Sequence, residues 1–321
     1  GEIRMKKIIM VIIVILALLC ALILGIGGNY LYNLAVNPSV SKDMVFNSSK
    51  NDVTQEETSG DVTEETKNWL EDESGYSDVY ITSDDGLKLH NYKIINEDTS
   101  NKWVIPVHGY TSSGVGMAYY AEKFYNMGYN VMIPDLRGHG ESEGDYIGMG
   151  WDDRNDIMNL IDYIIAEDNK AEIVLFGVSM GAATVMMVSG EELPSNVKAI
   201  VEDCGYTSAW DQFAYQLKVL FNLPEFPMMN IADIICKIRA GYFISDASAI
   251  KQVKKSVTPT LFIHGDSDSF VPFEMQEELY EACNAEKEKV VIEGAAHAKS
   301  SSTNPELYWT SIVDFLEKYV E

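Results

Sequence analysis

Residues 172–188 read EIVLFGVSMGAATVMMV, and this segment is the most informative in the chain. Its first part is an apolar run typical of a buried strand, and Ala182 to Val188 are typical of a buried helix. Between them stand Gly177, Ser179 and Gly181 in a Gly-x-Ser-x-Gly pattern. A turn this short leaves no room for larger side chains at its flanks, which explains the glycines. We therefore expect a strained serine whose hydroxyl is exposed above a sheet.

A serine nucleophile needs a base, and the base needs an acid that orients it. Where the serine stands on such a turn, the chain order is serine, acid, histidine. Only His264 and His297 follow Ser179. His297 comes just after the apolar segment 289–292, and Asp268 lies in the loop after the apolar segment that ends at His264. The order predicts Ser179, Asp268 and His297 as nucleophile, acid and base.

Other polar residues near these segments have alternative roles. Asp266 is the rival acid, but it directly follows the end of a strand and is more typical of a turn residue. The amide of Met180 opens the helix after the serine and is predicted to donate to an oxyanion. A second donor is expected from the loop 108–111. His108 and His139 are expected to organise their loops by hydrogen bonding.

The chain resembles α/β-hydrolases of the serine esterase and aminopeptidase-like group. It is similar in particular to membrane-anchored bacterial hydrolases of the YqkD and Bem46 type. The resemblance runs from about residue 76 to the C-terminus, and it implies that the amide of Tyr110 is the second oxyanion donor. Its motifs are specific for the superfamily but not for a substrate. They are Val107-His108-Gly109-Tyr110, Asp135-Leu136-Arg137-Gly138-His139-Gly140-Glu141-Ser142, Gly177-Val178-Ser179-Met180-Gly181, His264-Gly265-Asp266-Ser267-Asp268 and Gly294-Ala295-Ala296-His297.

The remaining pattern predicts an α/β fold with a mostly parallel sheet and helices on both faces, because apolar strands alternate with amphipathic helices. An antiparallel pair, 79–82 and 87–95, is expected to start it. Segment 208–249 breaks the alternation with apolar residues at helical spacing on both sides of a proline-bounded turn. In this fold such an insertion is a small helical cap. We expect it to line the acyl pocket, although the aromatic residues would also serve simply to pack the helices onto the sheet.

Composition narrows the partners and cofactors. The 321 residues carry a formal net charge of −25 and 46% hydrophobic residues. Nothing in this balance offers the basic stripe that a nucleic acid would require. The four cysteines match no zinc pattern, and Cys204 is expected to be buried and structural. Helix capping and the helix dipole would explain the acidic cluster of Asp152, Asp153 and Asp156, so we expect neither metal nor cofactor.

The N-terminus predicts a membrane anchor. Residues Ile8 to Ile26 are almost uninterruptedly apolar, long enough for a bilayer core, and Arg4, Lys6 and Lys7 precede them. The positive charges predict an N-inside orientation with the rest of the chain outside the cytoplasm. A cleaved signal peptide, which would give a secreted protein, is the alternative. The expected organisation is an anchor at 1–32, an acidic polar stalk at 33–75 and a hydrolase domain at 76–321.

The combined prediction is a serine hydrolase that cleaves a carboxylic ester, thioester or small amide through an acyl-enzyme intermediate. A peptidase of the aminopeptidase-like group is the alternative enzyme. Its cap would be expected to carry acidic residues that hold the substrate amine, and the cap here offers few candidates, namely Asp211, Glu225 and Asp233. The alternative outside enzymes is a catalytically inactive cell-surface interaction module. The sequence leaves the acyl group and the oligomeric state open.

Overall fold

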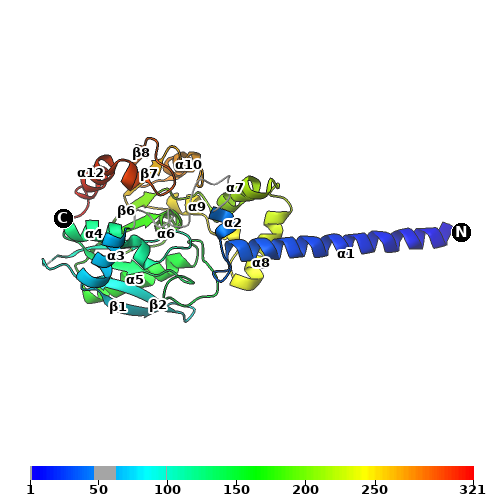
Figure 1. Ribbon diagram of the computed structural model, residues 1–321, viewed down its shortest axis with the longest axis horizontal. Helices are drawn as coiled ribbons and strands as arrows, with labels where there is room; N and C mark the ends of the chain where they lie inside the picture. Colours follow the sequence, from blue (N-terminus) through cyan, green and yellow to red (C-terminus); the bar gives the residue numbers. More distant parts are fainter. Residues whose placement is uncertain (1, 47–62, 99) are drawn as a thin grey trace.

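The computed structural model describes residues 2–46, 63–98 and 100–321 (Figure 1). Its centre is a single eight-stranded sheet in the order β1-β2-β4-β3-β5-β6-β7-β8. The first two strands form an antiparallel hairpin, β2 pairs antiparallel with β4, and all other neighbours are parallel. The strands are β1 (Ser77–Thr82), β2 (Lys88–Ile94), β3 (Lys102–Val107), β4 (Asn130–Pro134), β5 (Glu172–Val178), β6 (Val197–Asp203), β7 (Thr260–Gly265) and β8 (Lys287–Ile292).

Helices cover both faces of this sheet, as the alternating pattern predicts. The helices and helical turns are α1 (Glu2–Ala35), α2 (Asp43–Phe46), α3 (Glu64–Asn68), η2 (Trp69–Glu73), η3 (Gly114–Met117), α4 (Ala118–Asn126), α5 (Asp153–Glu167), α6 (Met180–Val188), α7 (Ala209–Phe221), α8 (Met228–Ala240), η4 (Ile244–Asp246), α9 (Ala249–Val253), α10 (Glu274–Ala282), α11 (Ser300–Thr303) and α12 (Pro305–Leu316).

The two faces of the sheet support separate hydrophobic layers. Along β3, Trp103 and Ile105 point into the layer shared with α5, α6 and α10, whereas Val104 points into the layer shared with α4 and α12. This alternation follows from the two-residue repeat of a strand. Both layers are fully buried, so the sheet is a rigid platform for the loops at the carboxyl ends of its parallel strands.

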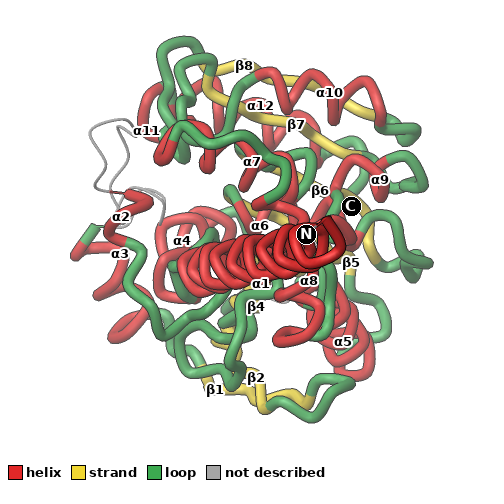
Figure 2. The backbone as a smooth tube through the Cα atoms, turned by 90° about the vertical axis from the view of Figure 1, so that its right-hand side faces the viewer, coloured by secondary structure: helices red, strands yellow, loops and turns green. Residues whose placement is uncertain are grey.

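The predicted cap is present as the helix pair α7 and α8, which are joined around the turn Asn222–Pro227. Ser208 begins α7, and its side chain accepts a hydrogen bond from the Asp211 amide. In Figure 2 both helices lie on the same side of the sheet as α1. The end of the long N-terminal helix therefore lies beside the cap, with α8 packed against it.

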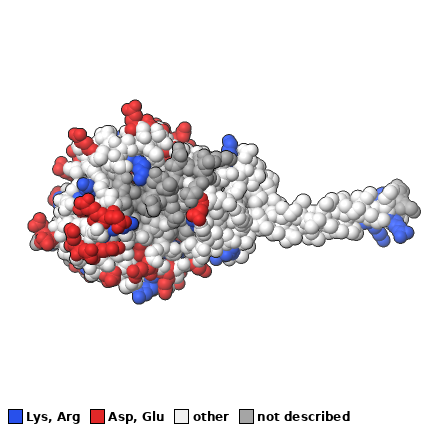
Figure 3. All heavy atoms as spheres, in the orientation of Figure 1, with Lys and Arg blue, Asp and Glu red and all other residues white. Residues whose placement is uncertain are grey.

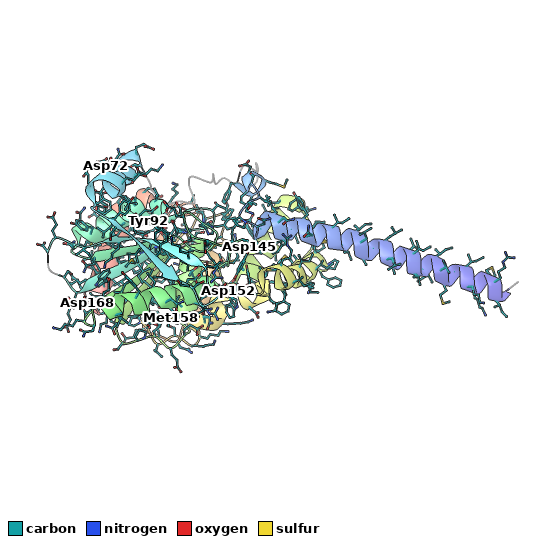
Figure 4. All side chains as sticks on the ribbon, turned by 90° about the horizontal axis from the view of Figure 1, so that it is seen from below. Asp72, Tyr92, Asp145, Asp152, Met158 and Asp168 are labelled. Atoms are coloured by element: carbon teal, nitrogen blue, oxygen red, sulfur yellow. The ribbon has the colours of Figure 1, made fainter. Side chains whose placement is uncertain are left out.

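Helix α1 is long and apolar enough to span a membrane over Ile3–Ala35, with a mean hydropathy of 3.4 in its most apolar stretch. Residues 3–26 are exposed, apart from the half-buried Leu24, and Figure 4 shows the side chains of this stretch projecting away from the rest of the chain. From Gly28 onward the helix packs against the domain. A Cβ atom at Gly28 would lie 2.5 Å from Cγ2 of Ile231, so this glycine lets α8 approach closely.

The segment predicted as a stalk differs from a loosely packed linker in its described parts. Val36 and Phe46 are buried in the hydrophobic layer that includes α5, α6 and α10. Leu70 is buried in the layer on the opposite face of the sheet, which includes α4 and α12. Residues 47–62 of the predicted stalk lie outside the described residues. The sequence did not reveal this packing because the few apolar residues are scattered in a polar stretch, without a helical or strand period.

Candidate active site

Ser179 sits at the tip of a sharp turn between β5 and α6. Its backbone angles are φ 58° and ψ −116°, a conformation that costs energy for a residue with a side chain. The two glycines are required by contact with the backbone. A Cβ at Gly177 would lie 2.3 Å from the Gly181 carbonyl oxygen, and a Cβ at Gly181 would lie 2.0 Å from that of Val107.

The structure brings the side chains of Ser179, His297 and Asp268 into one hydrogen-bonded chain. His297 Nε2 lies 2.9 Å from Ser179 Oγ, and its Nδ1 lies 2.7 Å from Asp268 Oδ2. With Nδ1 donating to the carboxylate, Nε2 is left to accept the serine proton. All three side chains are buried, although they come from three separate loops at the carboxyl edge of the sheet.

The loop that carries Asp268 fixes the carboxylate from both sides. Oδ1 accepts hydrogen bonds from the amides of Phe270 and Val271, both at 2.9 Å, and His264 Nε2 lies 3.1 Å from Oδ2. Burial alone would raise the pKa of Asp268, but the two imidazoles beside it and their hydrogen bonds hold it well below its ordinary value. Asp268 is therefore an anion throughout the neutral range.

The other polar residues of these loops have structural contacts. Asp266, the rival acid, is exposed, and it accepts a hydrogen bond from the Gly294 amide at 2.7 Å, which braces the loop before His297. His108 Nε2 accepts the Leu136 amide at 3.0 Å, so its Nδ1 donates to the Gly109 carbonyl. His139 likewise contacts a backbone carbonyl.

The amides of Tyr110 and Met180 lie on the two segments that approach each other at the serine. Met180 is the first residue of α6, where the turn geometry leaves amides without helical acceptors. Within the described part of the chain, neither amide has a hydrogen-bond acceptor. The Tyr110 hydroxyl instead reaches the N-terminal helix, where it donates to the Ala35 carbonyl at 2.7 Å. No pattern in the sequence indicated this contact between the Tyr110 hydroxyl and the N-terminal helix.

An apolar pocket opens beside Ser179. Its walls come from the cap, from the end of the N-terminal helix and α2, and from loops of the domain that include the one after β7. The cap therefore lines the pocket, and α1 takes part in it although the sequence placed it in a separate anchor. The lining residues include Leu31, Leu34, Ala35 and Val45 from the N-terminal segment, Gln212, Phe213, Gln216, Leu217, Leu220, Phe221, Met229 and Ala232 from the cap, and Tyr110, Met149, Tyr206, Phe270 and Val271 from the domain.

Helix α7 also holds the loop that carries Asp268. Gln212 and Gln216 each donate a side-chain hydrogen bond to the Phe270 carbonyl, at 2.8 and 3.0 Å, and the Tyr215 hydroxyl donates to the Ser269 carbonyl at 3.0 Å. The Phe270 ring packs on His297, with ring centroids 5.0 Å apart. The cap is thereby connected to both the acid and the imidazole, which no motif in the sequence indicated.

The acidic cluster at the start of α5 serves another purpose than helix capping. The Asp152 side chain makes no hydrogen bond that caps the helix. Asp156 forms a bidentate ion pair with Arg137, in which both N–O distances are 2.8 Å. Figure 4 labels Asp152 at the end of α5 that lies toward the cap. The pair ties the start of α5 to the loop after β4, so it is structural in a way the sequence did not specify.

Cys204 lies next to the site, with its sulfur within 4.8 Å of ligand atoms of Asp268 and His297. Burial raises the pKa of its thiol well above the ordinary range, so it stays protonated. A protonated thiol is a poor nucleophile and a poor metal ligand. This agrees with the expectation of a buried, structural cysteine.

Three comparisons place the chain among known proteins. The profile of a family described as Hydrolase_4, serine aminopeptidase S33, matches residues 98–223. The uncharacterized protein YqkD of Bacillus subtilis is 30% identical over 74% of this chain and 78% of its own length. The uncharacterized membrane protein YNL320W of Saccharomyces cerevisiae is 24% identical over 75% of this chain and 79% of its own.

Among solved structures, the Pyrococcus furiosus esterase Pf2001 superposes with a TM-score of 0.65 at 26% identity, covering 82% of this chain and 96% of its own. Fold, relatives and family profile agree, and the chain belongs to the α/β-hydrolase superfamily.

Proposed function

We propose that the protein is a serine hydrolase that cleaves a carboxylic ester, with Ser179, His297 and Asp268 as its catalytic triad. The observation that carries the proposal is the hydrogen-bonded chain from Ser179 Oγ through His297 to Asp268. The strained serine conformation supports it, because such strain is retained where it positions a functional group.

The reaction follows from these positions. Ser179 Oγ attacks the ester carbonyl carbon while His297 Nε2 takes the hydroxyl proton, and Asp268 stabilises the imidazolium that forms. The amides of Tyr110 and Met180 donate to the carbonyl oxygen as it becomes an oxyanion. His297 then gives its proton to the leaving alcohol, and the acyl group stays on Ser179. A water molecule, deprotonated by His297, attacks this acyl-enzyme and releases the carboxylic acid and the free serine.

The pocket favours an apolar acyl group. Its described lining contains no Asp, Glu, Lys or Arg, and most of its residues are aliphatic or aromatic. An ester with a hydrocarbon acyl chain would gain about 0.8 kcal/mol for each methylene that it buries there. A charged substrate group would lose its hydration at this position without a counterion.

An aminopeptidase-like activity is the second candidate, because the matching family profile carries that description. Such an enzyme would have to hold a substrate ammonium group. These three cap acids are engaged elsewhere: Asp211 accepts from the hydroxyls of Thr207 and Ser208, Asp233 accepts from Ser245, and Glu225 accepts from the Trp210 indole nitrogen. We therefore place ester hydrolysis first.

For the arrangement in the cell, we propose that α1 is a retained single-pass anchor with the catalytic domain outside the cytoplasm. The basic residues before the apolar run support this orientation. We also keep the division into anchor, connecting segment 33–75 and hydrolase domain, with the cap at about 208–249. Protease protection of intact cells, and N-terminal sequencing of the purified protein, test the orientation and the retention of the anchor.

The activity is tested with the full chain in detergent, using p-nitrophenyl esters of increasing acyl length beside Ser179→Ala. We expect turnover that disappears in Ser179→Ala and covalent labelling of the wild type by a fluorophosphonate. Aminoacyl p-nitroanilides measured in parallel detect the peptidase alternative. A folded protein with neither labelling nor turnover would contradict the assignment of Ser179 and leave the inactive interaction module as the better account.

A further inference from the structure

The cap carries a group of exposed apolar side chains, which we name the cap tip: Leu223, Phe226, Ile234 and Ile238. Phe226 is 76% exposed and Ile238 is 77% exposed. Side chains of this size rarely stay in water together unless a surface covers them. The tip includes the turn between α7 and α8 and one side of α8.

The cap tip lies where α1 leaves its exposed stretch. Met228, two residues after Phe226, lies against Gly27, and Ile231 lies against Gly28. Further along, the Arg239 guanidinium donates to the side chains of Asn29 and Asn33, at 2.8 and 2.9 Å. The contacts of α8 with α1 therefore begin at Gly27, where the exposed stretch of α1 ends, and continue to Asn33.

The geometry of α1 places the bilayer surface at this level. The exposed stretch from Ile3 to Ile26 has 24 residues and spans about 36 Å as a helix. A bilayer hydrocarbon core is about 30 Å thick. A helix that crosses the core with this stretch brings the domain, and the cap tip with it, directly to the headgroup region. In Figure 3 the visible acidic side chains lie mainly over the globular domain, and the surface beside α1 is mostly uncharged.

The pocket extends from Ser179 to the same level. Its lining reaches Leu31 on α1 and Phe221 at the end of α7, both only partly buried. The rings of Tyr30 on α1 and Phe221 on α7 meet edge to face, with centroids 6.4 Å apart. An acyl chain seated in the pocket would therefore run alongside the end of the membrane helix.

We propose that the cap tip is immersed in the headgroup region of the bilayer, and that the substrate is a long-chain fatty acyl ester that enters the pocket from the membrane beside α1. This substrate class rests on the ester hydrolysis proposed above, and the reaction steps at Ser179 are the same. The ester C–O bond breaks at Ser179, water supplies the new oxygen and proton, and a fatty acid and an alcohol leave. The end of α1 is then a wall of the acyl site as well as an anchor.

The test uses the full chain reconstituted in phosphatidylcholine vesicles. Two fluorogenic substrates are compared, 4-methylumbelliferyl oleate in the bilayer and 4-methylumbelliferyl acetate in the water. The double variant Phe226→Glu with Ile238→Glu places charge on the cap tip. We expect the ratio of oleate to acetate turnover to fall about tenfold, the change that about 1.4 kcal/mol of transition-state stabilisation makes.

Val257→Glu is the matched control. Val257 is also an exposed apolar residue, 88% exposed, but it precedes β7 at the opposite edge of the sheet from Ser179. We expect it to leave the ratio unchanged. An unchanged ratio in the double variant, or an equal fall in the control, would overturn the immersed cap tip.

A second variant tests the acyl path separately. Leu31→Trp narrows the pocket at its α1 wall and should lower the oleate-to-acetate ratio about tenfold, whereas Leu18→Trp in the exposed part of α1 should not. An unchanged ratio in Leu31→Trp would show that the acyl chain does not pass α1. Fluorophosphonate labelling of every variant separates the membrane-substrate proposal from the serine hydrolase proposal. Labelled variants with unchanged oleate-to-acetate ratios would contradict only the membrane substrate. A wild-type protein that is not labelled would contradict the serine hydrolase itself.

Discussion

At the scale of single residues, the site depends on one carboxylate that holds several donors. Asp268 receives two backbone amides and two imidazoles, so all its accepting positions are occupied. Asp268→Asn would keep the shape but place an NH2 group against at least one of these donors. His297 would then lose the tautomer that leaves Nε2 free to accept. We expect kcat to fall by about 10⁴-fold, as loss of the acid does in other triads.

Asp266→Asn is the matched control for that measurement, made with p-nitrophenyl esters. Asp266 accepts from the Gly294 amide, and an asparagine oxygen can still do so. Its kcat should stay within about twofold of wild type, since a neutral acceptor weakens only the exposed hydrogen bonds from the Gly294 amide and the Ser267 hydroxyl. A larger loss in Asp266→Asn than in Asp268→Asn would exchange the roles of the two acids.

A second residue-scale prediction concerns pH and stability. Glu202 is fully buried at the end of β6; its Oε2 accepts only the Gly205 amide, at 3.0 Å, and Oε1 has no partner in the described part of the chain. Burial raises the pKa of Glu202 to about 8. A raised carboxyl pKa stabilises the folded state at pH values below the ordinary pKa of the unfolded chain, about 4.3, and this contribution is lost as pH rises toward 8.

Glu202→Gln stays neutral at every pH and should remove that loss. We expect its thermal midpoint to exceed that of the wild type at pH 8 to 9, with the difference disappearing toward pH 5. Thermal unfolding of the full chain in detergent, followed by near-UV circular dichroism, measures it. Glu317→Gln, at an exposed position after α12, should show no such trend. A variant that is less stable than wild type at pH 9 would contradict the assigned burial effect.

At the scale of elements, the cap contacts the loop that carries Asp268 through α7. Gln212 and Gln216 share the Phe270 carbonyl, two residues beyond Asp268. Replacing both by alanine removes these hydrogen bonds and lets the loop move relative to His297. We expect kcat to fall about tenfold or more, because small displacements of catalytic groups are costly.

The readout that identifies a positioning effect is a comparison of ester turnover with the reaction of Ser179 toward a small electrophile, a fluorophosphonate. Fluorophosphonate labelling should slow together with kcat, since both need an aligned His297. Lys218→Ala, at an exposed position on the same helix, should leave both unchanged. Normal labelling with reduced ester turnover would instead assign the two glutamines to substrate contact alone.

Elements also show what the sequence could and could not predict. The strands β3, β5 and β6 and the turn at Ser179 were predicted within a residue or two, because apolar runs and paired glycines report directly on a buried strand and a tight turn. The contacts of Asp268 with His264 and of Phe270 with α7 were not predicted. These contacts join residues far apart in the chain or depend on the path of a loop. Neither kind of contact produces a periodic pattern or a fixed residue spacing in the sequence.

At the scale of the whole molecule, the N-terminal segment, which consists of α1 and the residues up to Phe46, has two parts with different surroundings. Up to Ile26 it is exposed, whereas Tyr32, Leu34, Val36 and, after the turn, Phe46 are buried in the domain. Burying four side chains of this size contributes about 6–12 kcal/mol. The net stability of a folded domain is typically about 5–15 kcal/mol, so we expect the domain to require the second part in order to fold.

A pair of truncations tests this division. A chain that starts at residue 27 lacks only the exposed stretch and should keep its thermal transition and its fluorophosphonate labelling in detergent. A chain that starts at residue 47 also lacks the buried side chains and the carbonyl of Ala35 that accepts the Tyr110 hydroxyl, so it should lose both. If the shorter chain were as stable and as reactive as the longer one, the end of α1 would be an anchor alone. If the prediction holds, proteolytic release near Gly25 to Gly27 would free the enzyme from the membrane with its acyl pocket complete, because every pocket residue of α1 lies beyond that point.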